Sequence, residues 1–196
     1  MARRRQRTLR VDDVEVLRAL ASPVRMEILT SLGGVGQASI AELARLLGRA
    51  PTSLYHHVDQ LVQRGLVVEA GTRPRGANDE RLFRLAADEV GLRHDPGDTE
   101  RAEAIADAVA SNLRAAERDF RASLVDGVGR VRGRGRDTFG ARYKGWLEEA
   151  DRRELFEHLE AIAALFRRRQ GATTGRLVTA TLVTAPAKER KRRHDD

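Results

Sequence analysis

The sequence has no cysteine, few aromatic residues and no long hydrophobic run. The absence of cysteine excludes a disulfide framework and favours a reducing compartment. No apolar segment approaches the ~18–20 residues that a helix needs to cross a bilayer, and no apolar segment follows the basic N-terminus as it would in a signal peptide. These absences predict a soluble cytoplasmic protein with no membrane partner, and 196 residues suffice for one or two small domains.

The net charge of +7 is concentrated at the two ends of the chain. We expect residues 1–10 to be a disordered basic tail and residues 187–196 a disordered charged tail. The remainder is formally neutral, so the charge alone does not identify a nucleic-acid-binding domain. Such tails add salt-sensitive attraction to phosphates or are simply solvated ends, and the sequence leaves both alternatives open.

The most informative stretch runs from Ser39 to Gly65, where two short amphipathic helices are predicted with a tight turn between them. Ser39 and Glu42 have the spacing of a capping box, in which each side chain accepts a hydrogen bond from the other residue's backbone amide. Gly48 ends the first helix because glycine adopts a positive φ at little cost. Pro51 begins the second helix, since its fixed φ suits a first helical position.

The outward face of the second helix carries uncharged side chains that form hydrogen bonds. At about 100° per residue, these outward residues are Thr52, Ser53, His56 and Gln60, with Tyr55 on the flank. His57 is rotated back toward the apolar side. Polar side chains near a helix N-terminus suit a DNA major groove, where base edges offer donors and acceptors. A helix that faces only water would more often carry Glu and Lys.

Two further helices are predicted before this stretch. Asp12 with Glu15 indicates one helix start, and Ser22 followed by Pro23 indicates another. The glycine-rich sequence GGVGQ is expected to end the second of these helices. This helix would lie beneath the two central helices and complete a three-helix core.

A β-hairpin is predicted after Gly65. The β-prone runs at residues 66–69 and 81–85 flank a segment rich in turn-forming residues. Arg73 and Arg75 would lie on the hairpin tip, where guanidinium groups contact the DNA backbone or a narrow minor groove. The alternative is an exposed loop with ordinary solubilising charges.

Taken together, these elements resemble the winged helix-turn-helix domain of ArsR-like bacterial transcriptional regulators. The resemblance rests on ALASPVRMEILTSL, on SIAELARLLGRAPTSLYHHVDQLVQRGLV, on the Gly/Arg-rich loop and on RLFRLA, and it covers roughly residues 12–86. It implies dimeric DNA binding with the helix from Pro51 as the reader. It also implies a supporting position for Arg25 behind the DNA-facing side, with a surface salt bridge as the alternative. Many members sense metals through cysteines, which this chain lacks.

A long amphipathic helix is expected from Glu100 to about Leu124. Its apolar stripe at three-to-four spacing consists of Ile105, Val109, Leu113, Ala116 and Phe120. A helix of about 36 Å is too long for a small domain to cover. We therefore expect this stripe, together with Leu17 and Leu20, to form a dimer interface. Packing against a later helix of the same chain is the alternative.

The rest of the chain predicts a small accessory module. The run VGRVRGRGR is expected to be a flexible loop, with minor-groove or RNA binding as the alternative. Alternating residues predict a strand over 138–147 and a second over 176–185, with a helix over 151–169 between them. Residues 98–186 would then form a dimerisation and accessory α+β region after a winged helix-turn-helix domain over residues 11–90.

Catalysis and metal binding find no support in the sequence. None of the five histidines has a metal-ligand spacing with carboxylates on a common helix face. The glycines at 33, 34 and 36 follow a helix instead of joining a strand to one, so they do not make a nucleotide-binding loop. We therefore expect no enzymatic activity, no catalytic residue, no metal and no cofactor.

The sequence as a whole predicts a mainly α protein with a small β component. In this α+β fold, a long dimerisation helix and a small helix/strand module follow the winged helix-turn-helix domain. We expect a homodimer that binds palindromic double-stranded DNA and regulates transcription. The expected DNA contacts are Thr52, Ser53, His56 and Gln60 to base edges, Gln37, Ser39, Arg49 and Tyr55 to phosphates, and Arg73 and Arg75 to the flanks.

Two other functions stay open. The first is a winged-helix protein-interaction module without specific DNA binding. The second is compatible with DNA binding: a small-molecule effector would occupy a pocket of the C-terminal module beside Tyr143 and Trp146 and change the spacing of the two reading helices.

Overall fold

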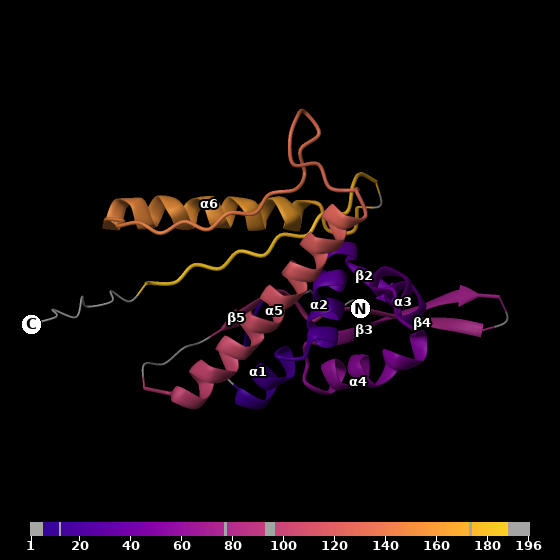
Figure 1. Ribbon diagram of the computed structural model, residues 1–196. Coiled ribbons are helices and arrows are strands. Elements are labelled where there is room, and N and C mark those ends of the chain that lie inside the picture. The colour runs from indigo at the N-terminus through magenta and orange to yellow at the C-terminus, as the bar shows by residue number, and fades with distance from the viewer. Residues whose placement is uncertain (1–5, 12, 77, 93–96, 173, 188–196) are drawn as a thin grey trace, which may run out of the picture.

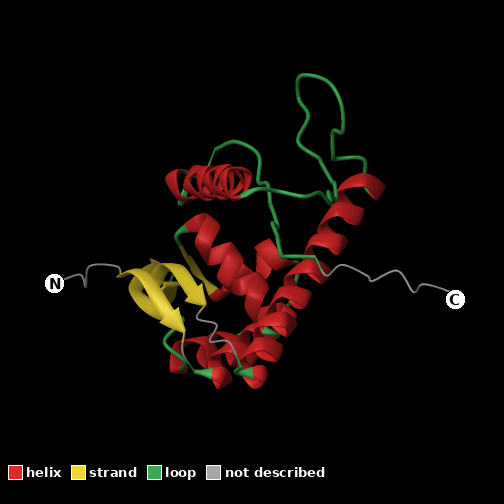
Figure 2. Ribbon diagram, turned by 90° about the vertical axis from the view of Figure 1, so that its left-hand side faces the viewer, coloured by secondary structure: helices red, strands yellow, loops and turns green. Residues whose placement is uncertain are grey.

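The computed structural model describes residues 6–11, 13–76, 78–92, 97–172 and 174–187. Its helices are α1 (Val14–Leu20), α2 (Pro23–Val35), α3 (Ile40–Leu47), the 3₁₀ turn η1 (Pro51–Ser53), α4 (Tyr55–Gln63), α5 (Thr99–Val125) and α6 (Glu149–Arg168). Its strands are β1 (Gln6–Val11), β2 (Gln37–Ser39), β3 (Val67–Arg75), β4 (Asn78–Leu85) and β5 (Ala87–Leu92). Helices predominate beside two small sheets, which confirms the predicted fold class (Figures 1 and 2).

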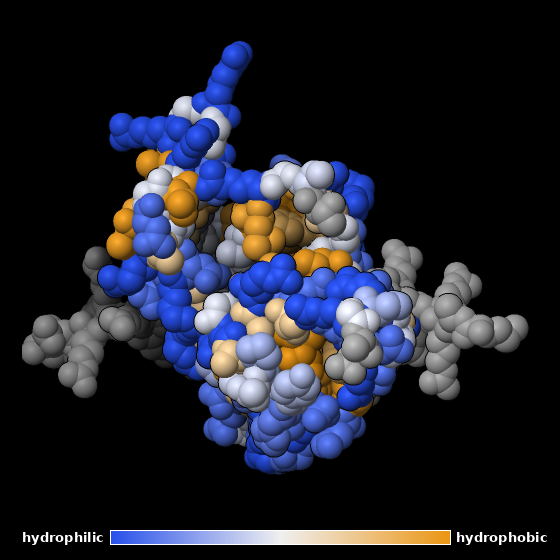
Figure 3. Space-filling view, turned by 90° about the vertical axis from the view of Figure 1, so that its right-hand side faces the viewer, coloured by the Kyte–Doolittle hydropathy of each residue, from blue (hydrophilic) through white to orange (hydrophobic). Residues whose placement is uncertain are grey.

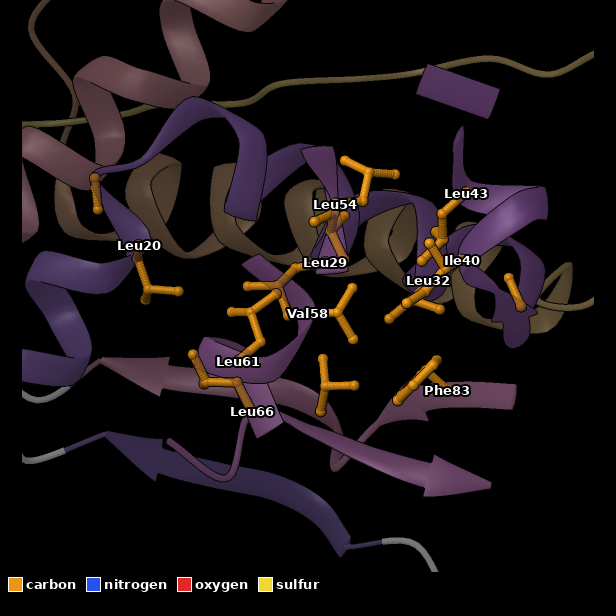
Figure 4. Close-up of a cluster of buried hydrophobic side chains, with 14 of the residues drawn as sticks. Leu20, Leu29, Leu32, Ile40, Leu43, Leu54, Val58, Leu61, Leu66 and Phe83 are labelled. Carbon is orange, nitrogen blue, oxygen red and sulfur yellow. The ribbon is translucent and has the colours of Figure 1, made fainter. Parts of the chain in front are cut away.

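The core of the N-terminal half lies between α2, α3 and α4. Apolar side chains recur at three-to-four spacing on each of these helices, so each helix buries one face against the others. Figure 4 shows these side chains pointing toward one another, together with Phe83 from β4. The fully buried members of this cluster include Ile28, Leu32, Leu43, Leu54, Val58 and Leu61. This arrangement confirms the predicted three-helix core.

Two helix boundaries differ from the prediction. Asp13, and not Asp12, caps α1, because its carboxylate accepts from the Glu15 amide at 2.8 Å; Asp12 lies outside the described residues. Helix α2 continues through Gly33 to Val35 and ends at Gly36, which has a φ of 82°. The glycines inside the helix therefore lower its propensity without ending it.

The antiparallel sheet has the strand order β2-β4-β3 and extends further than predicted. We expected short strands with a long loop between them, but β3 and β4 stay paired out to Arg75 opposite Asn78. At the other end of the sheet, β2 places Ala38 opposite the buried Phe83. Because β2 leads directly into α3, this pairing fixes the hairpin beside the helix-turn-helix (Figure 1).

A parallel pair of strands, β1 and β5, was not predicted. We expected residues 1–10 to be a disordered tail, but residues 6–10 belong to β1, and residues 1–5 lie outside the described part. The pairing joins segments about eighty residues apart, with Leu9 opposite Val90. Leu9 is packed against the hydrophobic core, and Val11 is buried in it, which explains why this basic segment becomes ordered.

Helix α5 packs along α1 and α2 (Figure 2). Ala104, Ala108 and Ser111 are buried, and their small side chains allow the helices to approach closely. Only part of the expected dimer stripe is exposed. The protomer itself half-buries Ile105, Val109 and Ala116, and it leaves Leu113 and Phe120 exposed. The expectation that Leu17 and Leu20 form a dimer interface is wrong, because they are 0% and 5% exposed and belong to the protomer core.

The C-terminal region contains the expected helix, α6, but not the expected strands. The segments 138–147 and 176–185 are irregular where the structure describes them, because neither has a strand beside it to pair with. No residue of α6 is buried. The segment after α6 is joined to α2 by hydrogen bonds from Gln170 to the Gly33 carbonyl and from the Gly171 amide to the Gly34 carbonyl, both 2.8 Å.

The expected effector pocket beside Tyr143 and Trp146 is not formed within one protomer. These side chains are 84% and 86% exposed. A pocket requires surrounding side chains to enclose a ligand, and the irregular segment that carries both residues provides no such enclosure.

Candidate nucleic-acid interface

The helix-turn-helix is held by local interactions that the sequence predicts. The Ser39 amide donates to the Glu42 carboxylate at 2.9 Å, and the Glu42 amide donates to the Ser39 hydroxyl at 3.2 Å, which completes the capping box. Gly48 adopts the left-handed conformation with a φ of 61°. Pro51 then opens a 3₁₀ turn, and the regular helix begins only at Tyr55. The end of α3 and the start of the 3₁₀ turn therefore each fall on a residue that suits the backbone conformation there.

We call η1 and α4 together the reading segment. The 3₁₀ turn places the polar front of this segment at the surface. Thr52, Ser53, Tyr55 and His56 are exposed, while Gln60, one turn later, is half-buried. The Ser53 hydroxyl donates to the Ala50 carbonyl at 2.7 Å, so toward a ligand it offers only its acceptor lone pairs. In Figure 3 the lower part of the molecule, at the level of α4 in Figure 1, is largely hydrophilic.

Three side chains form a connected polar network behind this front. Arg25 of α2 donates through Nε to the Ala19 carbonyl and through Nη1 to Oε1 of Gln60, both at 2.6 Å. Nε2 of Gln60 lies 2.8 Å from Nε2 of His56. The position of Arg25 agrees with the supporting place that the family resemblance implied. Both the oxygen and the nitrogen of the Gln60 amide therefore have hydrogen-bond partners within the protein. This argues against the expected role of Gln60 as a base contact.

His57 faces the other way, as its rotation along the helix predicts. Its side chain is half-buried, and its Nδ1 atom is buried without a hydrogen-bond partner in the described residues. Burial lowers the pKa of His57, and the positive charge of Arg25 lowers it further. Both effects favour the neutral ring, which belongs to the packing of α4 rather than to its outward face.

The hairpin arginines lie within β3 instead of on a loop. Arg73 donates to Glu42 at 2.8 Å and to Glu80 at 2.9 Å, and Arg75 donates to Glu80 at 2.7 Å. These carboxylates were not singled out in the sequence, although opposite charges on paired strands often interact. A shallow groove lined by Pro51, Tyr55 and Arg75 separates the hairpin from the start of the reading segment.

Ser39 is not available for the expected phosphate contact. It is 0% exposed, and besides capping α3 its hydroxyl forms a hydrogen bond with the Glu80 carboxylate. This hydrogen bond and the two arginines lower the pKa of Glu80 to about 2. Ser39 thus joins the helix-turn-helix to the hairpin, which is a structural role. Gln37, by contrast, is exposed on β2.

Arg49 lies in the turn between α3 and the reading segment, where the prediction placed a phosphate contact. Its guanidinium donates to the Glu27 carboxylate at 3.1 Å and keeps 38% of its side chain exposed. Glu27 was not recognised in the sequence, because its partners are distant along the chain. The exposed part of Arg49 still adds positive charge beside the reading segment.

The match to a known family falls on this part of the chain. A family model described as a helix-turn-helix domain matches residues 20–70. This part of the chain therefore carries a helix-turn-helix domain. The helix-turn-helix domain covers α2, α3 and α4 and the network of Arg25, Gln60 and His56. Among curated proteins, none matches the chain.

Three solved structures are similar to the chain at low levels. YusO from Bacillus subtilis has 18% identity and a TM-score of 0.30, and the similarity covers 59% of this chain and 82% of that one. A MarR family transcriptional regulator from Silicibacter pomeroyi has 22% identity and a TM-score of 0.28, with 76% of each chain covered. A C30AH42A mutant of ZitR from Lactococcus lactis has 13% identity and a TM-score of 0.27, with 78% and 87% covered.

Within the described ranges, no three His, Asp or Glu side chains come together as a metal site. Of the helices in those ranges, none is both long and apolar enough to span a bilayer.

Proposed function

We propose that the protein is a sequence-specific regulator of transcription that binds double-stranded DNA as a homodimer. The observation that carries this proposal is the exposed, uncharged polar front from Thr52 to His56, supported from behind by Arg25. Such a front places donors and acceptors where a major groove offers complementary base edges. Arg49 and Tyr55, with Gln37 on β2, would contact phosphates, and Arg73 and Arg75 would follow the flanking backbone.

The proposed dimer uses apolar surface that one protomer leaves uncovered. Large hydrophobic side chains are exposed on the C-terminal half of α5, at Leu113 and Phe120, and on α6, at Phe156, Leu165 and Phe166. In Figure 3, hydrophobic side chains reach the surface in the upper part of the molecule, at the level of α6 and the end of α5. A second copy is the partner that would cover this surface, since a twofold axis would also duplicate the reading helix.

Two finer assignments belong to the same proposal. The ArsR-like resemblance of residues 12–86 is the family assignment that we propose, and the bacterial cytoplasm is the compartment. An effector, if the protein takes one, would bind between two copies, because Tyr143 and Trp146 are not enclosed within one. Quenching of the single tryptophan by a metabolite library would detect such a ligand.

Selection of bound sequences from a random pool of duplexes tests the proposal. A homodimer with two reading helices should recover an inverted repeat with half-sites about one helical turn, ~34 Å, apart. Recovery of no preferred sequence at moderate salt would contradict it and would favour a protein-interaction module instead.

A further inference from the structure

The hydrogen bonds around Gln60 determine which nitrogen of His56 carries a proton. An arginine side chain has only donors, so the Gln60 atom that faces Arg25 at 2.6 Å must be the amide oxygen. The amide nitrogen of Gln60, which can only donate, then faces Nε2 of His56 at 2.8 Å. Nε2 must therefore accept, and in a neutral imidazole the proton lies on the other nitrogen, Nδ1.

We propose that Arg25 and Gln60 hold His56 in the Nδ1–H tautomer, so that His56 presents a hydrogen-bond donor to DNA. The contact between His56 and a base rests on the proposed function. The assignment of the tautomer is independent of that function. His56 is exposed at the front of α4, and the hydrogen bond that its ring forms within the described residues is at Nε2, which leaves Nδ1 open to a ligand. In this role Gln60 and Arg25 are positioning residues, and His56 is the residue that touches the base.

A donor at this position discriminates among bases. In the major groove, guanine presents two acceptors, adenine one beside a donor, and thymine one, whereas cytosine presents only a donor. A base opposite His56 should therefore offer an acceptor, with guanine first and cytosine excluded. Neighbouring His57 does not take part, because its ring is turned into the protein.

The substitution Gln60→Glu should keep both hydrogen bonds of residue 60 but reverse the direction of the one to His56. A carboxylate accepts hydrogen bonds from both sides, so it keeps Arg25 as a partner and requires a proton on Nε2 of His56. In the neutral ring, Nδ1 would then become an acceptor. The matched control is Gln63→Glu, which adds the same charge to an exposed position on the same helix.

Nitrogen-15 NMR of the free, full-length protein tests the tautomer directly. The wild type and Gln63→Glu should show the Nδ1–H form of His56, and Gln60→Glu should show the Nε2–H form. A wild-type protein in the Nε2–H form would overturn the proposal regardless of any DNA result.

Selection of bound sequences from random duplexes with the same three proteins tests the proposed contact between His56 and a base. At one position of the recovered site, Gln60→Glu should shift the preference from guanine toward cytosine or adenine by roughly tenfold or more, while Gln63→Glu leaves the preferred base unchanged. An unchanged site for Gln60→Glu, with a reversed tautomer, would overturn the reading role. If no protein selected any sequence, the proposed function and the reading role would both fail, and NMR would still decide the tautomer.

Discussion

Arg118 in α5 donates a hydrogen bond of 2.6 Å to the carboxylate of Glu27 in α2. The same carboxylate accepts from Arg49, in the turn of the helix-turn-helix, at 3.1 Å. A single half-buried acidic side chain therefore links the long helix to the turn beside the reading segment.

Replacement of Glu27 by glutamine should weaken both ion pairs while keeping the shape of the side chain. We expect the free energy of unfolding to fall by about 1 kcal/mol, since each partly exposed pair contributes little. Urea denaturation measures this change. The control Glu103→Gln removes an exposed carboxylate from α5 and should change stability by less than about 0.5 kcal/mol. Equal losses for both variants would show that Glu27 forms no special link.

Two glycine-to-alanine substitutions should have opposite effects. Gly48 has a φ of 61°, so alanine there is strained and should lower the free energy of unfolding by about 1 kcal/mol. Gly34 lies within α2, and a Cβ added there would meet open space, so alanine there should raise stability by about 0.5–1 kcal/mol. Urea denaturation of the two variants provides the comparison. Stabilisation by Gly48→Ala would contradict the left-handed helix end.

Acid should weaken the contact between the hairpin and α3. The pKa of Glu80 is lowered to about 2 by its hydrogen bond with Ser39 and by the two hairpin arginines. The unfolded chain therefore takes up this proton first as the pH falls, and the contribution of Glu80 is complete above about pH 4.5 and lost between there and about pH 2. Urea midpoints measured across this range should fall less for Glu80→Gln than for the wild type. Parallel curves would contradict the lowered pKa.

Much of the reading segment could be predicted because its determinants are close together in the sequence. Ser39 and Glu42 are three residues apart, and Gly48 and Pro51 act on their own backbone. The outward position of His56 and the inward position of His57 follow from helical geometry alone. These short-range rules need no knowledge of the rest of the fold.

The errors concern contacts between distant segments. The alternation over 138–147 predicts a strand, but a strand needs a neighbour, and no neighbouring strand is present in the described structure. Conversely, the sequence of β1 predicts a tail, because its arginines interrupt the apolar pattern of a short strand that pairs with the distant β5. The sequence does not identify the partners of Arg25, Arg49 and Arg73 either. Many acceptor residues lie far along the chain from each arginine, and the sequence does not show which of them come close in the fold.

The proposed dimer can be tested on α6. Leu165 is half-exposed on that helix, and a charge at this position should prevent apolar packing with a second copy. Leu165→Glu should therefore sediment as a monomer at micromolar concentration, while the wild type and the exposed-surface control Arg153→Gln sediment as dimers. A wild type that sediments as a single chain would refute the proposed assembly.

Binding of two variants to the selected duplex and to random DNA tests the central claim most directly. His56→Ala should lose about 1–3 kcal/mol of discrimination between the two duplexes, because His56 is assigned a base contact. Arg75→Ala should weaken binding to both duplexes alike and reduce the salt dependence, because Arg75 is assigned to the backbone. Equal losses on both duplexes for His56→Ala would contradict the claim that the polar front from Thr52 to His56 reads DNA sequence.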